Sequence, residues 1–340
     1  MSHDTHISAL ERASHLLILG MVATAHYKLL STAVLRDVAT WVGAAMTDFD
    51  APLGQLVAVE LCSNGFSLIG IYVDVASLIE SLFALATGLD ERTSAELRSA
   101  ARTAAIHVAS LNTPLFVSTL AKSIVGAKTA HRRNATLRFC ALLVRKKPLM
   151  LTPALPKLVE AVVKSLEPQG AIREAVGQTV ALVLVELTRT YPFVDVHDGI
   201  QRLVLGTAEG ACVVFDLKTG TRLYVLDAHR SAVTACAFSP DGRRLVSASL
   251  GESRVVVYKV GSSVLSMLRP GAPPRQGTPA GEPYKVRLAT LEGLTTQTLP
   301  VFHGDDLSRA SELELVSFDW PAPRSARLRI RETALTFETT

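Results

Sequence analysis

The sequence has few of the residues that build metal and redox sites. Among 340 residues there are four cysteines, Cys62, Cys140, Cys212 and Cys236, and none of them lies at the spacing of paired metal ligands. Cys212 and Cys236 fall in segments with strand-like patterns, where a free cysteine behaves as a small apolar residue. The sequence therefore predicts buried, reduced thiols in the cytosol and no metal site.

The short motifs of common enzyme classes are also absent from the sequence. It contains no HExxH, no paired-cysteine zinc pattern and no GxSxG. Gly206 and Gly210 have the spacing that opens a phosphate loop, but no Gly-Lys-Ser/Thr ending and no helical pattern follow, so a hairpin turn is expected. No catalytic or cofactor-binding residue is predicted, and the chain is interpreted as non-enzymatic. An intact site in a pocket between helices and strands would reverse this interpretation.

Charge is scarce and nearly balanced. Charged residues make up 19% of the chain and the net charge is +4, which is too small to predict nucleic-acid binding. Two basic clusters lie at residues 128–147 and 324–331. Each is interpreted either as a solvated surface or as a docking surface for an acidic partner.

No apolar run of membrane-spanning length is free of charge. Hydrophobic residues make up 48% of the chain, and the longest apolar stretch is 66–86. It contains Asp74 and Glu80, and each carboxylate in the middle of a spanning helix costs up to ~3 kcal/mol. A buried helix, or a pair of helices broken near Gly70, is therefore expected here.

Residues 1–192 are predicted to form an α-helical, solenoid-like domain. About nine short helices are expected between residue 7 and residue 190, with apolar faces such as Leu155, Leu158, Val159 and Val162. Thr93, Thr113 and Thr152 are predicted as helix N-caps. Short helices joined by short loops are typical of stacked HEAT or armadillo pairs, and a globular helical bundle is the alternative.

Residues 193–340 are predicted to form a partial WD-repeat β-propeller. Strand-like patterns begin near Gln201, and two blades end at Phe215-Asp216 and Tyr258-Lys259. The 43-residue interval from Phe215 to Tyr258 lies within the ~40–45-residue period of WD repeats. Polar turns separate the strands, at 209–210, 218–220 and 239–242.

The second blade contains candidates for the hydrogen-bonded tetrad of a WD repeat. This tetrad joins a histidine, a turn aspartate, a serine or threonine and a tryptophan. The candidates are His229, Asp241, Ser247 or Ser249, and Tyr258 in the aromatic position. Asp241 is expected to accept a hydrogen bond from His229. All of these residues are interpreted as structural.

The last part of the chain predicts one further, weaker blade. Residues 269–283 are rich in proline and glycine and are expected to form a flexible loop. Strand-like segments follow at 285–291, 313–319, 327–330 and 335–338. Two clear blades and one weak blade are fewer than the roughly four to eight of a closed propeller. Apolar strand faces are therefore expected to meet water, at Leu203, Val213, Val246 and Val256.

Three segments together resemble the C-terminal part of the rabconnectin-3 beta subunit family: 62–86, 101–124 and 201–268. The resemblance extends over most of residues 10–268 and weakens after the Pro/Gly loop. It implies WD blades at both ends of a long helical region, and no catalytic residue. The N-terminal blades are missing from this sequence. The missing blades are therefore expected to come from a longer version of the chain or from another polypeptide.

The resemblance also implies a function. The family works with a DmX-like alpha subunit to regulate assembly of the vacuolar proton-pumping ATPase (V-ATPase), and so organelle acidification. It implies a cytoplasmic protein that reaches vesicle, endosomal or vacuolar membranes only through partners, without a cofactor or nucleic acid. The alternative is another solenoid-plus-propeller scaffold in vesicle trafficking or coat assembly. Co-purification of pump subunits with the full-length protein distinguishes the two.

Overall fold

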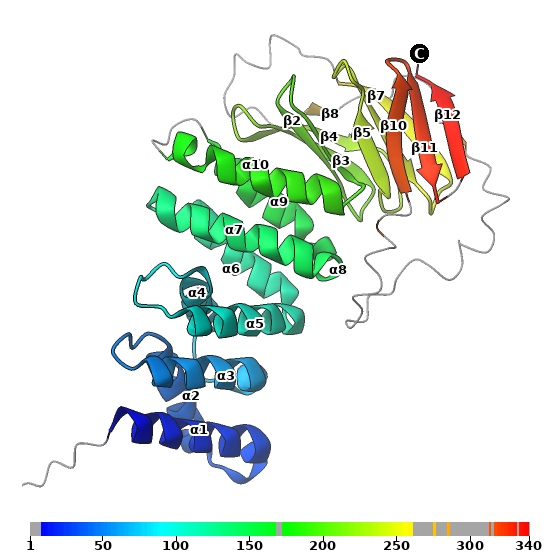
Figure 1. Ribbon diagram of the computed structural model, residues 1–340. Helices are drawn as coiled ribbons and strands as arrows, with labels where there is room; N and C mark the ends of the chain where they lie inside the picture. Colours follow the sequence, from blue (N-terminus) through cyan, green and yellow to red (C-terminus); the bar gives the residue numbers. More distant parts are fainter. Residues whose placement is uncertain are drawn as a thin grey trace, which may run out of the picture. The chain divides into compact units, whose positions relative to one another are not determined.

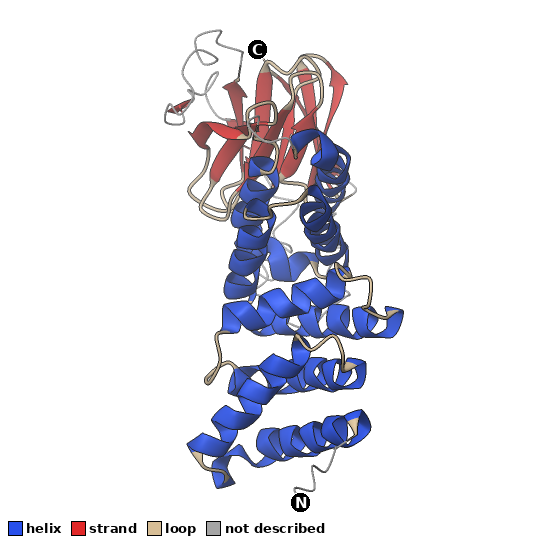
Figure 2. Ribbon diagram, turned by 90° about the vertical axis from the view of Figure 1, so that its left-hand side faces the viewer, coloured by secondary structure: helices blue, strands red, loops and turns tan. Residues whose placement is uncertain are grey.

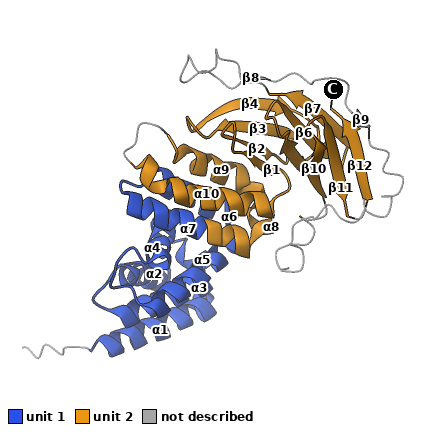
Figure 3. Cartoon of the chain, turned by 45° about the horizontal axis from the view of Figure 1, so that its top comes forward, with its two compact units in different colours: residues 1–140 blue, residues 141–340 orange. Residues whose placement is uncertain are grey.

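Helices precede strands along the chain (Figure 2). The computed structural model describes residues 8–167, 172–260, 275–276, 284–285, 313, 316–331 and 333–339. The chain divides into two compact units, residues 1–140 and 141–340 (Figure 3). The predicted order, a helical region followed by a partial β-propeller, is confirmed.

The first unit consists of helices packed in layers. They are α1 (Ala9–His26), α2 (Thr32–Met46), α3 (Pro52–Ile69), α4 (Val75–Thr87), α5 (Ala95–Leu111) and α6 (Thr113–Val125), with a 3-10 turn, η1 (Tyr27–Leu29). Helix α3 packs against α1, α2 and α5, while α4 packs against α5 and α6 (Figure 1). The rings of Phe83 and Phe116 meet edge to face at 5.0 Å. The helical pattern of this region therefore reflects burial of apolar faces between neighbouring helices.

The long apolar stretch is a helix pair that breaks at Gly70, as expected. Helix α3 ends at Ile69, and Asp74 is the N-cap of α4, where its carboxylate accepts a hydrogen bond from the Ser77 N–H at 3.0 Å. Asp74 and Glu80 are both exposed. None of the described helices is long and apolar enough to cross a membrane.

The three predicted threonine caps are wrong. Helix α5 is capped by Ser94, which accepts from the Leu97 N–H at 3.1 Å. Helix α6 is capped by Asn112, which accepts from the Leu115 N–H at 3.2 Å. Thr152 lies in a 3-10 turn, η2 (Thr152–Ala154), and its hydroxyl donates to a carbonyl one turn earlier. At the first two sites a serine or asparagine adjoins the threonine, and both rank above threonine as N-caps.

The second unit begins within α7 (Ala130–Lys146) and continues through α8 (Pro148–Leu151), α9 (Leu155–Lys164) and α10 (Arg173–Thr190). The first strand, β1 (Val194–His197), starts earlier than the expected Gln201. It is only four residues long and alternates apolar with polar side chains, and it pairs antiparallel with β2 (Arg202–Gly206). A strand of four residues directly after a helix gives little periodic signal in the sequence.

The strands form three sheets in the described residues. The first has the order β1-β2-β3-β4-β8, with β3 (Ala211–Asp216), β4 (Thr221–Asp227) and β8 (Arg275–Gln276). The second has the order β5-β6-β7-β9, with β5 (Ala235–Phe238), β6 (Arg244–Ser249), β7 (Arg254–Lys259) and β9 (Tyr284–Lys285). The third is β10-β11-β12, with β10 (Val316–Ala322), β11 (Ser325–Ile330) and β12 (Thr333–Glu338). Because β5 contacts both β1 and β10, these three are the inner strands of successive blades.

The weak C-terminal blade is therefore a three-stranded sheet in the described part of the chain. Its strands overlap the predicted segments 313–319, 327–330 and 335–338. The predicted loop at 269–283, apart from β8, lies outside the described residues. The predicted strand at 285–291 likewise lies outside them beyond Lys285.

The expectation that apolar blade faces meet water is wrong for three of the four residues named. Leu203 and Val246 are 0% exposed and Val256 is 1% exposed, while Val213 is half-buried. The second blade is sandwiched: Ala235, Ala248 and Val255 form one buried cluster with residues of β10 and β11. Sheet-on-sheet packing therefore removes these faces from water without a closed ring.

Helices α9 and α10 lie against the first blade. Arg222 on β4 pairs with Glu160 on α9. Arg173 on α10 donates to the carbonyl oxygens of Lys218 and, at 3.4 Å, of Leu217. The first blade is thus joined to helices within the same compact unit.

Candidate functional site

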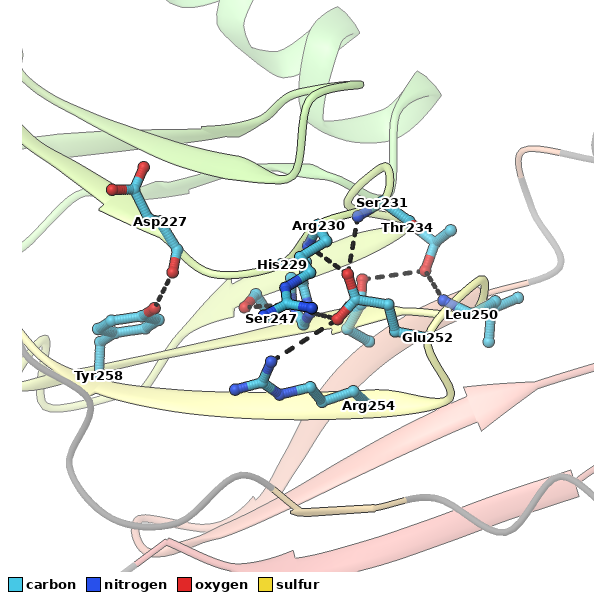
Figure 4. A network of polar contacts seen from close by, with 11 residues as sticks. Asp227, His229, Arg230, Ser231, Thr234, Ser247, Leu250, Glu252, Arg254 and Tyr258 are labelled. Atoms are coloured by element: carbon cyan, nitrogen blue, oxygen red, sulfur yellow. Dashed lines mark hydrogen bonds and ion pairs between the residues drawn. The ribbon is translucent and has the colours of Figure 1, made fainter.

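A buried polar cluster joins the β4–β5 loop to the β6–β7 hairpin (Figure 4). At its centre is His229, whose side chain is fully buried. Its Nε2 lies 3.0 Å from the hydroxyl of Ser247 on β6. The His229 N–H donates to the carbonyl oxygen of Gly210 at 2.9 Å. Gly210 has φ +93°, and a Cβ there would clash with the carbonyl of His229, so this approach requires glycine.

Glu252, in the β6–β7 turn, is the acidic member of the cluster. Its Oε1 accepts hydrogen bonds from the backbone N–H groups of Arg230 and, at 2.8 Å, of Ser231. Its Oε2 lies 3.8 Å from His229 Nδ1 and 3.7 Å from an Arg254 nitrogen. One carboxylate thus holds the loop after β4 against the hairpin that closes the blade (Figure 4).

Asp241 is not part of this cluster. It lies in the turn between β5 and β6, where its carboxylate accepts from the Ser239 hydroxyl at 2.5 Å and from the Arg243 N–H at 3.0 Å. The expected hydrogen bond from His229 to Asp241 is therefore wrong. The aspartate closes its own turn, in the manner of an Asx turn, while Glu252 faces the histidine.

The other predicted residues lie on the strands of the first two blades. The Tyr258 hydroxyl donates to the carbonyl oxygen of Asp227 at 3.0 Å and so links β7 to the end of β4. The Ser249 hydroxyl is buried without a hydrogen-bond partner among the described residues. Phe215-Asp216 ends β3, the strand of the first blade that corresponds to β7, which ends at Tyr258-Lys259. The Asp216 carboxylate accepts from the Lys218 N–H at 2.7 Å and shapes the next turn.

Burial sets the charge state of His229, and hydrogen bonds with nearby charges set that of Glu252. Burial lowers the pKa of His229 to about 4, although the nearby Glu252 carboxylate acts in the opposite direction. Partial burial raises the pKa of Glu252, but hydrogen bonds from Arg230 and Ser231 and the charges nearby outweigh it, so its pKa lies below the usual value. At neutral pH the imidazole is neutral and the carboxylate is ionised.

The cluster has the residue types of a Ser-His-acid triad but is closed to substrate. Ser247 is 0% exposed and the side chain of His229 is fully buried. A nucleophile must reach the substrate carbonyl, which this serine cannot do without opening the blade. The geometry instead fits a structural role, in which polar contacts hold the β4–β5 loop against the β6–β7 hairpin of one blade. In the described residues no group of three or more His, Cys, Asp or Glu is placed to hold a metal ion. The four cysteines are free and buried, as expected.

Two members of the cluster were missed by reasoning from the sequence. Glu252 sits in a Leu-Gly-Glu-Ser turn just before β7, and a glutamate there is a weaker turn signal than the Ser-Pro-Asp-Gly of Asp241. Thr234 donates to the Ala248 carbonyl oxygen at 3.0 Å and accepts from the Leu250 N–H at 3.2 Å. Its position immediately before β5 was the available signal.

The segment that contains the cluster matches a known family. The family described as WD domain, G-beta repeat matches residues 220–258, which run from the residue before β4 to the penultimate residue of β7. This segment is a WD repeat, so the chain contains at least one WD repeat. WD repeats build rigid platforms for binding other proteins, so the class of function is a protein–protein interaction scaffold.

Proposed function

We propose that this protein is a non-enzymatic scaffold, similar to the rabconnectin-3 beta subunit, that regulates V-ATPase assembly and organelle acidification. The observation that supports it is the order of segments. Two helical segments, 62–86 and 101–124, and a WD segment, 201–268, each resemble that family and follow in the same order. The first two segments fall on α3 to α6, and the WD repeat falls on β4 to β7.

The proposed partners are a DmX-like alpha subunit and subunits of the pump. The protein would work in the cytoplasm and reach vesicle, endosomal or vacuolar membranes through them. In this proposal His229, Ser247, Ser249, Tyr258, Asp241, Phe215 and Asp216 hold the blades in shape and do not contact substrate. In this proposal the surfaces of the scaffold bind the partners, while the buried polar cluster keeps the blade that carries them in shape.

The test is affinity purification of the tagged full-length protein from cells, with mass spectrometry of what co-purifies. We expect pump subunits and the alpha subunit, and slower acidification of vesicles when the protein is depleted. The Glu252→Ala variant, which removes the carboxylate that holds the β4–β5 loop, is expected to recover less of both. Asp241→Ala, which removes only hydrogen bonds within the β5–β6 turn, is the matched acidic control and is expected to lose less. Recovery of coat or tethering proteins without pump subunits would show the alternative scaffold function instead.

A further inference from the structure

The two basic clusters predicted from the sequence differ in how their charge is balanced. In the cluster near the C-terminus, Arg327 and Arg329 each lie 2.7 Å from a carboxylate oxygen of Asp319. In the other cluster, an Arg145 nitrogen lies 3.7 Å from a carboxylate oxygen of Glu186. Arg145 is also in the last turn of α7, where a cation interacts favourably with the helix dipole. These arginines therefore have a role within the chain.

The start of α7 has the opposite arrangement of charge. Its first turn contains His131, Arg132 and Arg133 and no acidic residue, whereas the first turns of α1, α5 and α10 each contain a glutamate. A cation there is unfavourable, because the N-terminal end of a helix carries partial positive charge. Arg133 has a structural role, since its guanidinium donates to the carbonyl oxygens of Val125 and Ala127 at 3.1 and 3.0 Å. Arg132 has no comparable role, and its charge does not stabilise the helix.

Four exposed residues lie at this part of α7 and in the loop before it, and we call them the α7 basic surface: Lys128, His131, Arg132 and Arg138 (Figure 1). His131 and Arg138 are seven residues apart, so they lie on one face of the helix, about 10 Å apart along its axis. Ala135 lies between them on this face and is too small to keep a partner away. Within the described ranges of the chain, none of the four makes an ion pair.

We propose that the α7 basic surface binds an acidic segment of a partner protein, with carboxylates of that segment at Arg132 and Arg138. A guanidinium group can bind a carboxylate through two parallel hydrogen bonds, which favours arginine for this contact. The net charge of the whole chain is only +4, which is small for a nucleic-acid partner. Helix α7, all of which the structure describes, exposes no large apolar side chain that would enter a lipid layer. The surface does not depend on which assembly the scaffold serves.

The test uses the full chain and a fluorescent peptide with a run of glutamates, and the control is the same peptide with glutamines. We expect fluorescence anisotropy to show binding of the glutamate peptide only, and binding that weakens as salt is added. A carbodiimide, which joins a carboxylate to a nearby lysine amine, locates the bound peptide, and we expect the cross-link at Lys128. Cross-links at other lysines and none at Lys128 would overturn the proposal. Tighter binding to phosphatidylserine vesicles than to the peptide would assign the surface to a membrane instead.

A charge reversal separates binding from stability. Arg132→Glu is expected to weaken binding of the glutamate peptide by about tenfold, or about 1.4 kcal/mol. The same variant should leave the urea midpoint unchanged or raise it, because an acid in the first turn favours the helix. The matched control is Arg36→Glu at an exposed position of α2, which changes the net charge equally and should change binding by less than about twofold. Equal weakening by both variants, or a lower urea midpoint for Arg132→Glu, would overturn the proposal.

Discussion

At the scale of single residues, Glu252, which faces His229, should contribute more to the free energy of unfolding than Asp241 in the β5–β6 turn. Glu252→Ala leaves the N–H groups of Arg230 and Ser231 without their acceptor, so we expect a loss of about 1–3 kcal/mol in the free energy of unfolding. Asp241→Ala removes two local hydrogen bonds in an exposed turn, and we expect about 1 kcal/mol or less. Urea denaturation of both variants measures the difference, and equal losses would contradict it.

The buried imidazole predicts a dependence of stability on pH. The folded-state pKa of His229 is about 4, below the value of about 6.5 expected in the unfolded chain. Because the unfolded chain binds the proton first, stability is full above pH 6.5 and falls as the pH drops toward 4, by about 3 kcal/mol in all. Comparison of urea midpoints at pH 7.5 and pH 5 with those of His229→Gln isolates this contribution. Parallel pH profiles for the two proteins would refute it.

The sequence and the structure agree on part of this cluster for a physical reason. His229 and Ser247 were both expected in the hydrogen-bonded set, and their atoms lie 3.0 Å apart. Ser247 occupies a position fixed by the pattern of β6, and His229 lies in the short segment between β4 and β5. The acid could not be chosen in the same way, because Asp241 and Glu252 both lie in turns beside the same strand. Which turn meets the histidine depends on how the β4–β5 loop folds back, and this contact is not local in the sequence.

At the scale of elements, a substitution on β2 tests how well the first blade is packed. Leu203 is 0% exposed and lies opposite Phe215 on β3. Leu203→Ala should therefore cost about 2–5 kcal/mol of unfolding free energy, since it removes a fully buried side chain and leaves a cavity. Val213→Ala, on the neighbouring strand and only half-buried, is the matched control and should cost clearly less. Similar losses at both positions would contradict this difference in burial.

Element types were easier to predict than element ends. The helices and the strands of the first two blades have strong periods, and burial of one face enforces them. The caps of α5 and α6 were displaced by one residue, because two adjacent polar residues compete for each and only the backbone geometry decides. Strand β1 was missed because its pairing with β2 and its contact with β5 define it more than its own composition does.

At the scale of the whole molecule, blade burial depends on neighbours at both ends of the stack. The second blade packs between the first and the third. The first blade contacts α9 and α10 through Arg222 and Arg173. The outward face of the third blade has Asp319, Arg327 and Arg329, which are polar and compatible with water. An incomplete ring can be stable when its terminal faces are either covered by helices or polar.

Two fragments test where the domain that contains the blades begins: at residue 193, as the sequence predicts, or at residue 141, where the second compact unit begins. A fragment of residues 193–340 begins just before β1 and lacks α9 and α10, so the side of the first blade against those helices meets water. We expect this fragment to aggregate. A fragment of residues 141–340 retains both helices, and we expect a soluble monomer with a cooperative thermal transition. Size-exclusion chromatography and thermal melting of the two fragments are the measurement. A monodisperse 193–340 fragment that melts cooperatively would show that the helices are dispensable, whereas aggregation of both would show that the stack needs further blades.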